Sequence, residues 1–120
     1  QYAYVRTLSI LRKAEEAGIS MEGLTKANLE LLKEKEELDL IRQLIYFPEI
    51  LEDVVNEREP HLIVFYLMEL ARNFHHYYEH HRVLGVEPDL SLARLCLIKG
   101  LNNVFGKGLE LIGVSRPTRM

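Results

Sequence analysis

The chain has 120 residues, a hydrophobic content of 48% and a formal net charge of −3. That length fits one domain, and the balance of apolar and charged residues excludes a disordered chain. No apolar run is long enough to span a membrane, and no signal peptide is visible. Because the sequence opens with Gln1 inside a helix-like pattern, we expect a domain taken from a longer protein.

The acidic and basic residues are unevenly distributed along the chain. Residues 1–88 hold 10 basic and 16 acidic residues, whereas residues 89–120 hold 5 basic and 2 acidic ones. This distribution favours the C-terminal part as the contact for an anionic partner, although the net charge argues against bulk nucleic-acid binding.

Cys96 is the single cysteine, so an internal disulfide is excluded. This usage fits a reducing compartment. Cys96 lies in an apolar run, which predicts a small buried core residue rather than a nucleophile.

The first third of the chain contains one clear helix. Tyr4, Leu8 and Leu11 follow the i, i+4, i+7 spacing of a helix, and Gly18 is its predicted stop. Residues 19–28 have a mixed pattern that predicts a loop. Residues 30–37 are rich in charge and predict the solvated start of a second helix.

Two prolines divide the middle of the chain. Pro48 is predicted to interrupt one amphipathic helix and to open the next. Pro60 is predicted to separate that helix from the following one in the same way. The apolar positions of the three helices are Leu38, Ile41, Leu44 and Ile45, then Ile50, Leu51, Val54 and Val55, then Ile63, Leu67, Leu70, Phe74 and Tyr77.

The last segment predicts a central helix and a short final one. Residues 84–88 are a linker, and residues 90–105 are apolar over a wide arc. Gly106 and Gly108 are predicted to end that helix before a short one over 109–112. No alternating run indicates a strand. We therefore predict one all-α domain over residues 1–120, a helical bundle of about five to six helices.

Four histidines are the first candidates for chemistry: His75, His76, His80 and His81. His76 and His80 are four residues apart and could face one metal ion. Zinc sites need a third ligand, however, and the chain has no paired cysteines and no HExxH pattern. We predict no metal site, with a histidine metal sensor as a minor alternative. Some of these histidines could instead approach phosphate.

No pattern of catalytic residues is present. Gly106-Lys-Gly108 is not a phosphate-binding loop, and no local spacing suggests a nucleophile with its base. We therefore expect this fragment to have no catalytic residues and no activity by itself.

The adjacent Tyr77 and Tyr78 are better candidates for binding. They are separated by about 100° on a helix, so Tyr78 should point to the edge if Tyr77 completes the buried stripe. An edge tyrosine with basic neighbours can stack an unpaired RNA base. The alternative is that both rings pack in the core. The C-terminal Met120 follows two arginines and is either an ordinary tail residue or a soft contact for a base.

Several segments, in order along nearly the whole chain, resemble the C-terminal DALR anticodon-binding domain of the arginyl-tRNA synthetase family. The segments are Gln1-Tyr-Ala-Tyr-Val-Arg6, Ser9-Ile-Leu-Arg-Lys13, Phe47-Pro-Glu49, Glu59-Pro-His61, Leu67 to Leu84, Ala93-Arg-Leu95, Gly108-Leu-Glu-Leu-Ile-Gly-Val114 and Arg119-Met120. Two positions depart from the family pattern. The D-A-L-R tetrapeptide reads Ser91-Leu-Ala-Arg94, and Tyr4 stands where the entry motif usually has histidine.

The resemblance implies a set of RNA-binding residues. Tyr2, Arg6 and Arg12 would face the anticodon arm. Tyr78 and Met120 would contact an anticodon base, the central C. Arg94 marks the DALR position, and an RNA contact and a structural ion pair both remain open for it.

The resemblance also implies a function and partners. The expected role is binding of the tRNA-Arg anticodon stem-loop for an arginine-specific tRNA synthetase of the cytoplasm. The partners would be that tRNA and the catalytic domain of the same chain, without DNA or membrane. ATP, Mg²⁺ and arginine would be bound in the class I catalytic domain, and this domain would hold no cofactor. The alternative is a non-catalytic helical protein-interaction module that holds a partner in its apolar grooves.

Overall fold

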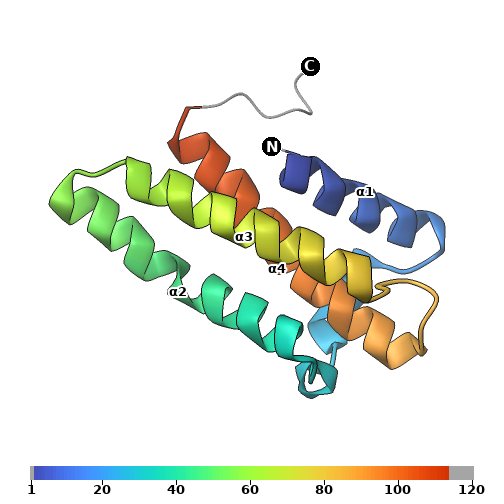
Figure 1. Ribbon diagram of the computed structural model, residues 1–120. Helices are drawn as coiled ribbons and strands as arrows, with labels where there is room; N and C mark the ends of the chain where they lie inside the picture. The colour runs from blue at the N-terminus through green and yellow to red at the C-terminus, as the bar shows by residue number, and fades with distance from the viewer. Residues whose placement is uncertain (1, 114–120) are drawn as a thin grey trace.

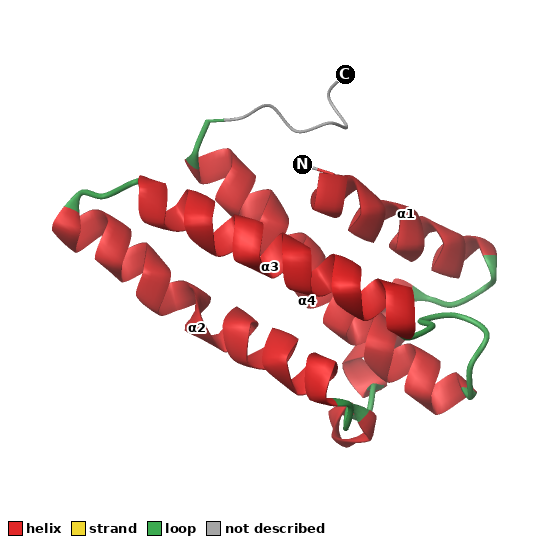
Figure 2. Cartoon of the chain, in the orientation of Figure 1, coloured by secondary structure: helices red, strands yellow, loops and turns green. Residues whose placement is uncertain are grey.

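The computed structural model describes residues 2–113, which form a helical bundle without strands (Figure 2). The prediction of an all-α fold is confirmed. No helix among the described residues has the length and apolar character needed to cross a membrane. Residues 2–113 form four α-helices and two short 3-10 helices in this order: α1 Tyr2–Glu16, η1 Met21–Lys26, η2 Leu29–Leu31, α2 Lys35–Glu57, α3 His61–His80 and α4 Pro88–Leu111.

Helix α3 occupies the middle of the bundle. It lies between α1 and α2, with α4 behind it (Figure 1). Helix α1 packs mainly on α4, and α2 packs mainly on α3. Cys96 is only partly buried, so the prediction of a core cysteine is wrong. The fully buried centre takes side chains from three helices: Leu40, Leu70, Phe74, Tyr77, Leu95, Ile98 and Leu101.

Helix α1 ends as the sequence predicts. Gly18 has a φ of 89°, a left-handed conformation that glycine adopts without strain. The Ile19 amide donates to the Ala14 carbonyl at 3.0 Å, which is the long-range bond of a Schellman cap. The cap ends α1 before the segment that leads to η1.

The segment after α1 contains more helix than expected. Ser20 caps η1 by accepting from the Glu22 amide at 3.2 Å, and Asn28 caps η2 by accepting from the Glu30 amide at 3.1 Å. Leu24 and Leu32 are buried and attach this segment to the core. The predicted loop over 19–28 is therefore partly helical, and the next α-helix begins at Lys35, later than the charge pattern indicated.

The predicted break at Pro48 is wrong, because α2 runs through it from Lys35 to Glu57. Proline removes one backbone donor and disturbs the preceding turn. In that turn, the Tyr66 hydroxyl donates to the Gln43 carbonyl, and the Asn73 amide donates to the Gln43 side chain at 2.9 Å. These bonds from α3, with the apolar contact of α2 on α3, offset the loss.

The predicted end of the last long helix at Gly106 and Gly108 is also wrong. Helix α4 continues to Leu111, so the expected short helix over 109–112 is part of it. A Cβ atom on Gly108 would lie 2.6 Å from a methyl carbon of Leu67, and one on Gly106 would lie 3.1 Å from the ring of Tyr4. The glycines are therefore close-contact positions between helices.

Candidate nucleic-acid interface

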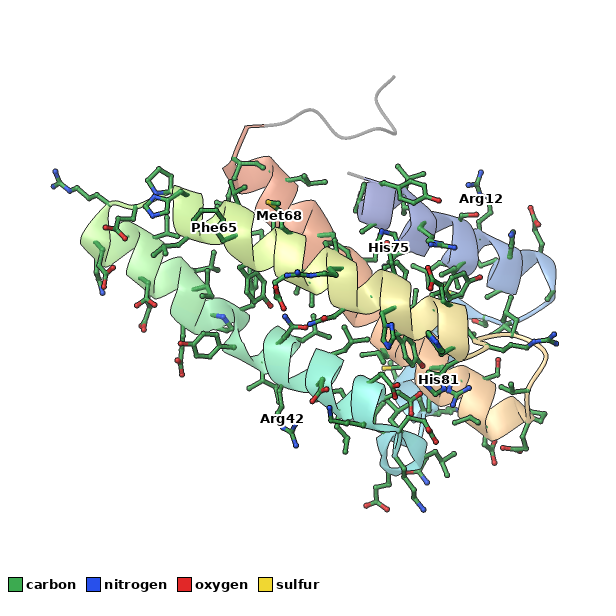
Figure 3. All side chains as sticks on the ribbon, viewed as in Figure 1. Arg12, Arg42, Phe65, Met68, His75 and His81 are labelled. Carbon is green, nitrogen blue, oxygen red and sulfur yellow. The ribbon has the colours of Figure 1, made fainter. Side chains whose placement is uncertain are left out.

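Four side chains meet where α1 faces the C-terminal half of α3: Tyr2, Arg6, His75 and Tyr78, here called the α1–α3 cluster. An Arg6 guanidinium nitrogen lies 3.0 Å from His75 Nδ1. The Arg6 guanidinium carbon lies 4.7 Å from the centre of the Tyr78 ring and 5.8 Å from that of Tyr2. The Tyr2 and His75 rings are stacked with centres 5.2 Å apart. Figure 3 shows His75 on the side of α3 that faces α1.

Helical spacing explains why these side chains gather. Tyr2 and Arg6 are four residues apart on α1, and His75 and Tyr78 are three apart on α3, so each pair shares a helix face. Tyr77 is completely buried, and Tyr78 is half-buried beside it. Tyr77 therefore completes the core stripe and Tyr78 lies at its edge, so the alternative in which both rings pack in the core does not hold for Tyr78.

The cluster perturbs the titration of His75. Partial burial lowers the pKa of His75 below its ordinary value, and the Arg6 charge lowers it further, while Glu79 acts in the opposite direction. Tyr2 is 68% exposed and offers most of its ring to solvent. The cluster is therefore an accessible aromatic surface with one fixed positive charge.

A groove of about 350 Å³ lies next to Tyr78 and is lined by Lys13 and Arg82, among other residues. Neither cation was predicted from the sequence to bind RNA. Lys13 is seven residues after Arg6, two helical turns along the same face of α1. Arg82 is four residues after Tyr78 in the chain. Both spacings were visible in the sequence and could have identified these residues.

Arg12, which was predicted to bind RNA, does not join the cluster. Arg12 is six residues after Arg6, which rotates it by about 120° around α1. It is exposed and extends away from His75 and α3 (Figure 3). Met120 lies outside the described residues.

Arg94 is buried in a polar triad that joins three helices. Its Nε donates to Glu37 Oε2 at 2.7 Å, and the Tyr77 hydroxyl donates to the same oxygen at 2.6 Å. The other Glu37 oxygen accepts from the Glu34 amide at 3.1 Å and caps α2. Burial and the Glu37 carboxylate raise the pKa of Tyr77. The geometry favours the structural ion pair over an RNA contact for Arg94.

The Ser91–Arg94 tetrapeptide also fixes the loop that follows α3. Arg94 donates to the Arg82 carbonyl at 2.8 Å, and the Ser91 hydroxyl donates to the Val83 carbonyl at 2.6 Å. The Val83 side chain is also buried, so this loop is fixed by hydrogen bonds to its backbone and by one apolar side chain. These bonds set the position of Arg82 beside Tyr78.

The histidines do not form the metal site considered from their spacing. Within residues 2–113, the three-residue grouping whose ligand atoms lie close enough is Glu34, Glu36 and His81. It excludes His76 and His80, whose rings lie 4.4 Å apart. Glu34 already caps α2, and the positive end of a helix dipole disfavours a cation there. The absence of a metal site in the chain stays a prediction.

Comparison with known families agrees with this geometry. A family model described as the DALR anticodon binding domain matches residues 1–120. The match covers all four α-helices and both sides of the α1–α3 cluster.

Three curated relatives are each named arginine–tRNA ligase. The chain is 43% identical to that of Aquifex aeolicus over 123 residues, 44% identical to that of Geobacter metallireducens over 120 residues, and 43% identical to that of Syntrophotalea carbinolica over 120 residues. In each case the match covers 100% of this chain and only 21% or 22% of the relative. The chain thus spans about a fifth of the length of these relatives.

Proposed function

The chain belongs to the DALR anticodon-binding domain family, and we propose that it binds the anticodon loop of arginine tRNA through the α1–α3 cluster. The observation that carries this proposal is the Arg6 guanidinium over the Tyr78 ring, at the rim of a groove lined by Lys13 and Arg82. RNA is read mainly through unpaired bases that stack on aromatic rings or guanidinium planes. The cluster offers both surfaces side by side.

The residues have separate roles in this proposal. Tyr78 and Tyr2 stack on splayed bases, and Arg6 adds a cation next to both rings. Lys13 and Arg82 contact phosphates and set the register of the loop, with Arg12 reaching the anticodon arm further along. Met120 supplies a further base contact to the central C of the anticodon. Arg94 acts through Arg82 and Tyr77 rather than on RNA.

The activity of a longer parent protein follows from the same proposal. The domain would hold the anticodon while a separate catalytic domain of the same chain joins arginine to the tRNA, with ATP and Mg²⁺ bound there. This domain would contribute affinity and orientation, without a catalytic residue of its own. The expected location is the cytoplasm.

A Tyr78→Ala variant tests the stacking role. We expect it to bind an RNA hairpin with the arginine anticodon loop more weakly by about 1–3 kcal/mol, because the base loses its aromatic platform. Tyr46→Ala is a matched control, since Tyr46 is an exposed tyrosine on α2, outside the cluster. Filter binding measures both affinities, and circular dichroism confirms that both variants fold.

The same assay tests which base is recognised. A hairpin changed at the central anticodon base should bind the wild type more weakly and should bind Tyr78→Ala with little further loss. Equal losses for Tyr46→Ala and Tyr78→Ala would contradict the assignment of the site.

The protein-interaction alternative has one observation in its favour. An apolar groove of about 640 Å³ lies between the ends of α2, α3 and α4 and is lined by Leu51, Val55 and Leu111, among others. Val55 is 74% exposed and Leu111 is 54% exposed. An amphipathic helix of a protein partner would fit such a groove. Its binding would depend only weakly on salt and would not change with Tyr78.

A further inference from the structure

His75 joins the two halves of the α1–α3 cluster. Its ring stacks on Tyr2, while its Nδ1 atom lies 3.0 Å from the Arg6 guanidinium. Arg6 in turn lies over Tyr78. His75 therefore contacts one residue that presents a ring to solvent and another that places a charge over the proposed stacking platform.

The contact with Arg6 defines the protonation state of His75. A guanidinium can only donate hydrogen bonds and remains charged at all relevant pH values. Nδ1 must therefore accept, which places the single ring proton on Nε2. A protonated imidazole would present an N–H to the guanidinium and add a second positive charge beside it.

The surroundings favour this neutral ring. Partial burial lowers the pKa of His75 first, followed by the charge of Arg6. Glu79, on the same helix, is the one group that raises it. The Tyr2 and Phe74 rings contact the imidazole without adding a charge. The neutral form therefore dominates from neutral pH down to below 6.5, the ordinary value for histidine.

An arginine on a surface helix normally samples many rotamers. Fixing it before the ligand arrives removes an entropic cost from binding, because less side-chain freedom is lost in the complex. In the described part of the chain, the polar contact recorded for the Arg6 guanidinium is with His75 Nδ1. The imidazole thus restrains Arg6 by a hydrogen bond, beside the contacts of the guanidinium with the Tyr2 and Tyr78 rings.

We propose that His75 is a positioning residue whose neutral ring holds Arg6 over Tyr78 ready for an RNA base, and that protonation of the ring releases Arg6. This inference rests on the proposed function. Under this proposal, RNA binding weakens as the pH falls. A histidine that simply added positive charge for phosphate would instead strengthen binding as the pH falls. Above pH 6.5 the His75 ring is neutral and holds Arg6 over Tyr78. This contact is lost as the pH falls through the lowered pKa of His75.

Two substitutions distinguish the role of His75 as a hydrogen-bond acceptor for Arg6 from its role as a ring that stacks on Tyr2. His75→Asn places its side-chain oxygen near the position of Nδ1 and keeps an acceptor for Arg6, but it loses the stack on Tyr2. His75→Phe keeps the stack and loses the acceptor. We expect His75→Phe to bind the anticodon-loop hairpin about five- to tenfold more weakly at pH 7.5, and His75→Asn to stay within about twofold of the wild type.

The pH profile is measured as the ratio of the wild-type affinity to that of His75→Asn. The other histidines are the same in both proteins, so their effects cancel in the ratio. We expect the ratio to fall between about pH 7.5 and about pH 5, since only the wild type loses its acceptor. A ratio that rises or stays constant, or a His75→Asn variant as weak as His75→Phe, would overturn the proposal.

A second measurement does not depend on RNA. Nitrogen chemical shifts from NMR should show the His75 proton on Nε2, with a pKa below 6.5 that rises in Arg6→Gln. An unchanged pKa in Arg6→Gln would exclude the coupling, whatever the binding data show. A wild type that folds and shows this coupling, yet binds no hairpin, would reject the proposed function and the RNA role of His75 together, leaving only the local contact.

Discussion

At Arg94, a guanidinium that is 9% exposed lies against the Glu37 carboxylate, which is completely buried. Burying two charges costs free energy, and their attraction repays this only when the remaining polar atoms are paired. Here Tyr77, the Glu34 amide and the Arg82 carbonyl complete the pairing. Arg94, at the DALR position, thus links α2, α3 and α4, and its bond to the Arg82 carbonyl also fixes where Arg82 lies.

Removing one charge of this pair should be costly. Arg94→Met leaves the Glu37 carboxylate buried without its cation, so we expect the free energy of unfolding to fall by about 3–5 kcal/mol. The double variant Arg94→Met with Glu37→Gln carries no buried charge and should recover part of that loss. Urea denaturation followed by circular dichroism measures both. If the double variant were less stable than Arg94→Met alone, the unpaired charge would not be the cause.

At the scale of the elements, α2 and α4 show that packing between helices can override residues that usually end a helix. Pro48 and the glycines of α4 are residues that usually end helices. In α2, the turn before Pro48 is bonded by Tyr66 and Asn73 of α3. In α4, the glycines let Leu67 and Tyr4 approach the helix backbone. The neighbouring helix therefore decides whether each residue acts as a break or as a contact.

Gly108→Ala tests this role of glycine. Alanine is the better helix former by about 1 kcal/mol, but its Cβ would overlap the buried side chain of Leu67. We expect a net destabilisation of about 1–2 kcal/mol because overpacking outweighs propensity. In a Leu67→Ala background the overlap disappears, and the same change should be neutral or stabilising. Thermal denaturation of the four proteins in this cycle gives the coupling energy directly.

At the scale of the whole molecule, the fold separates opposite charges. Helix α2 carries 7 acidic and 2 basic residues. It lies on the far side of α3 from α1 (Figure 1). The cations around Tyr78 come from α1 and from the loop after α3, although the sequence pattern favoured the C-terminal part for an anionic partner. A protein with a net charge of −3 can therefore present a basic face to RNA.

This separation predicts how RNA binding depends on salt. If Lys13 and Arg82 each neutralise one phosphate of an unpaired loop, the plot of log K against log salt should have a slope of about −1.4. Lys13→Gln should reduce the magnitude of that slope by about 0.7. Arg58→Gln is the control, because Arg58 follows α2 at the opposite end of α3 from Tyr78. A slope near zero would instead favour the apolar groove and a protein partner.

Much of the fold and part of the site could be predicted without coordinates. The 3.6-residue periodicity identified the all-α class, helix α1 and the buried stripe of α3, and Gly18 indicated the end of α1. The same periodicity gave the step of about 100° between Tyr77 and Tyr78, but it left open whether both rings pack in the core. The family resemblance supplied Tyr2 and Arg6 as partners of Tyr78.

Only the tertiary structure decided the contacts between residues that are far apart in the chain. Arg6 and His75 are separated by 69 positions, and Glu37 and Arg94 by 57. Local periodicity contains no information on such pairs, since each depends on how whole helices are oriented and packed. Sequence alone determined which faces of the helices are apolar. Packing of those faces then buried Arg94, kept Pro48 and Gly108 inside helices, and brought His75 to Arg6.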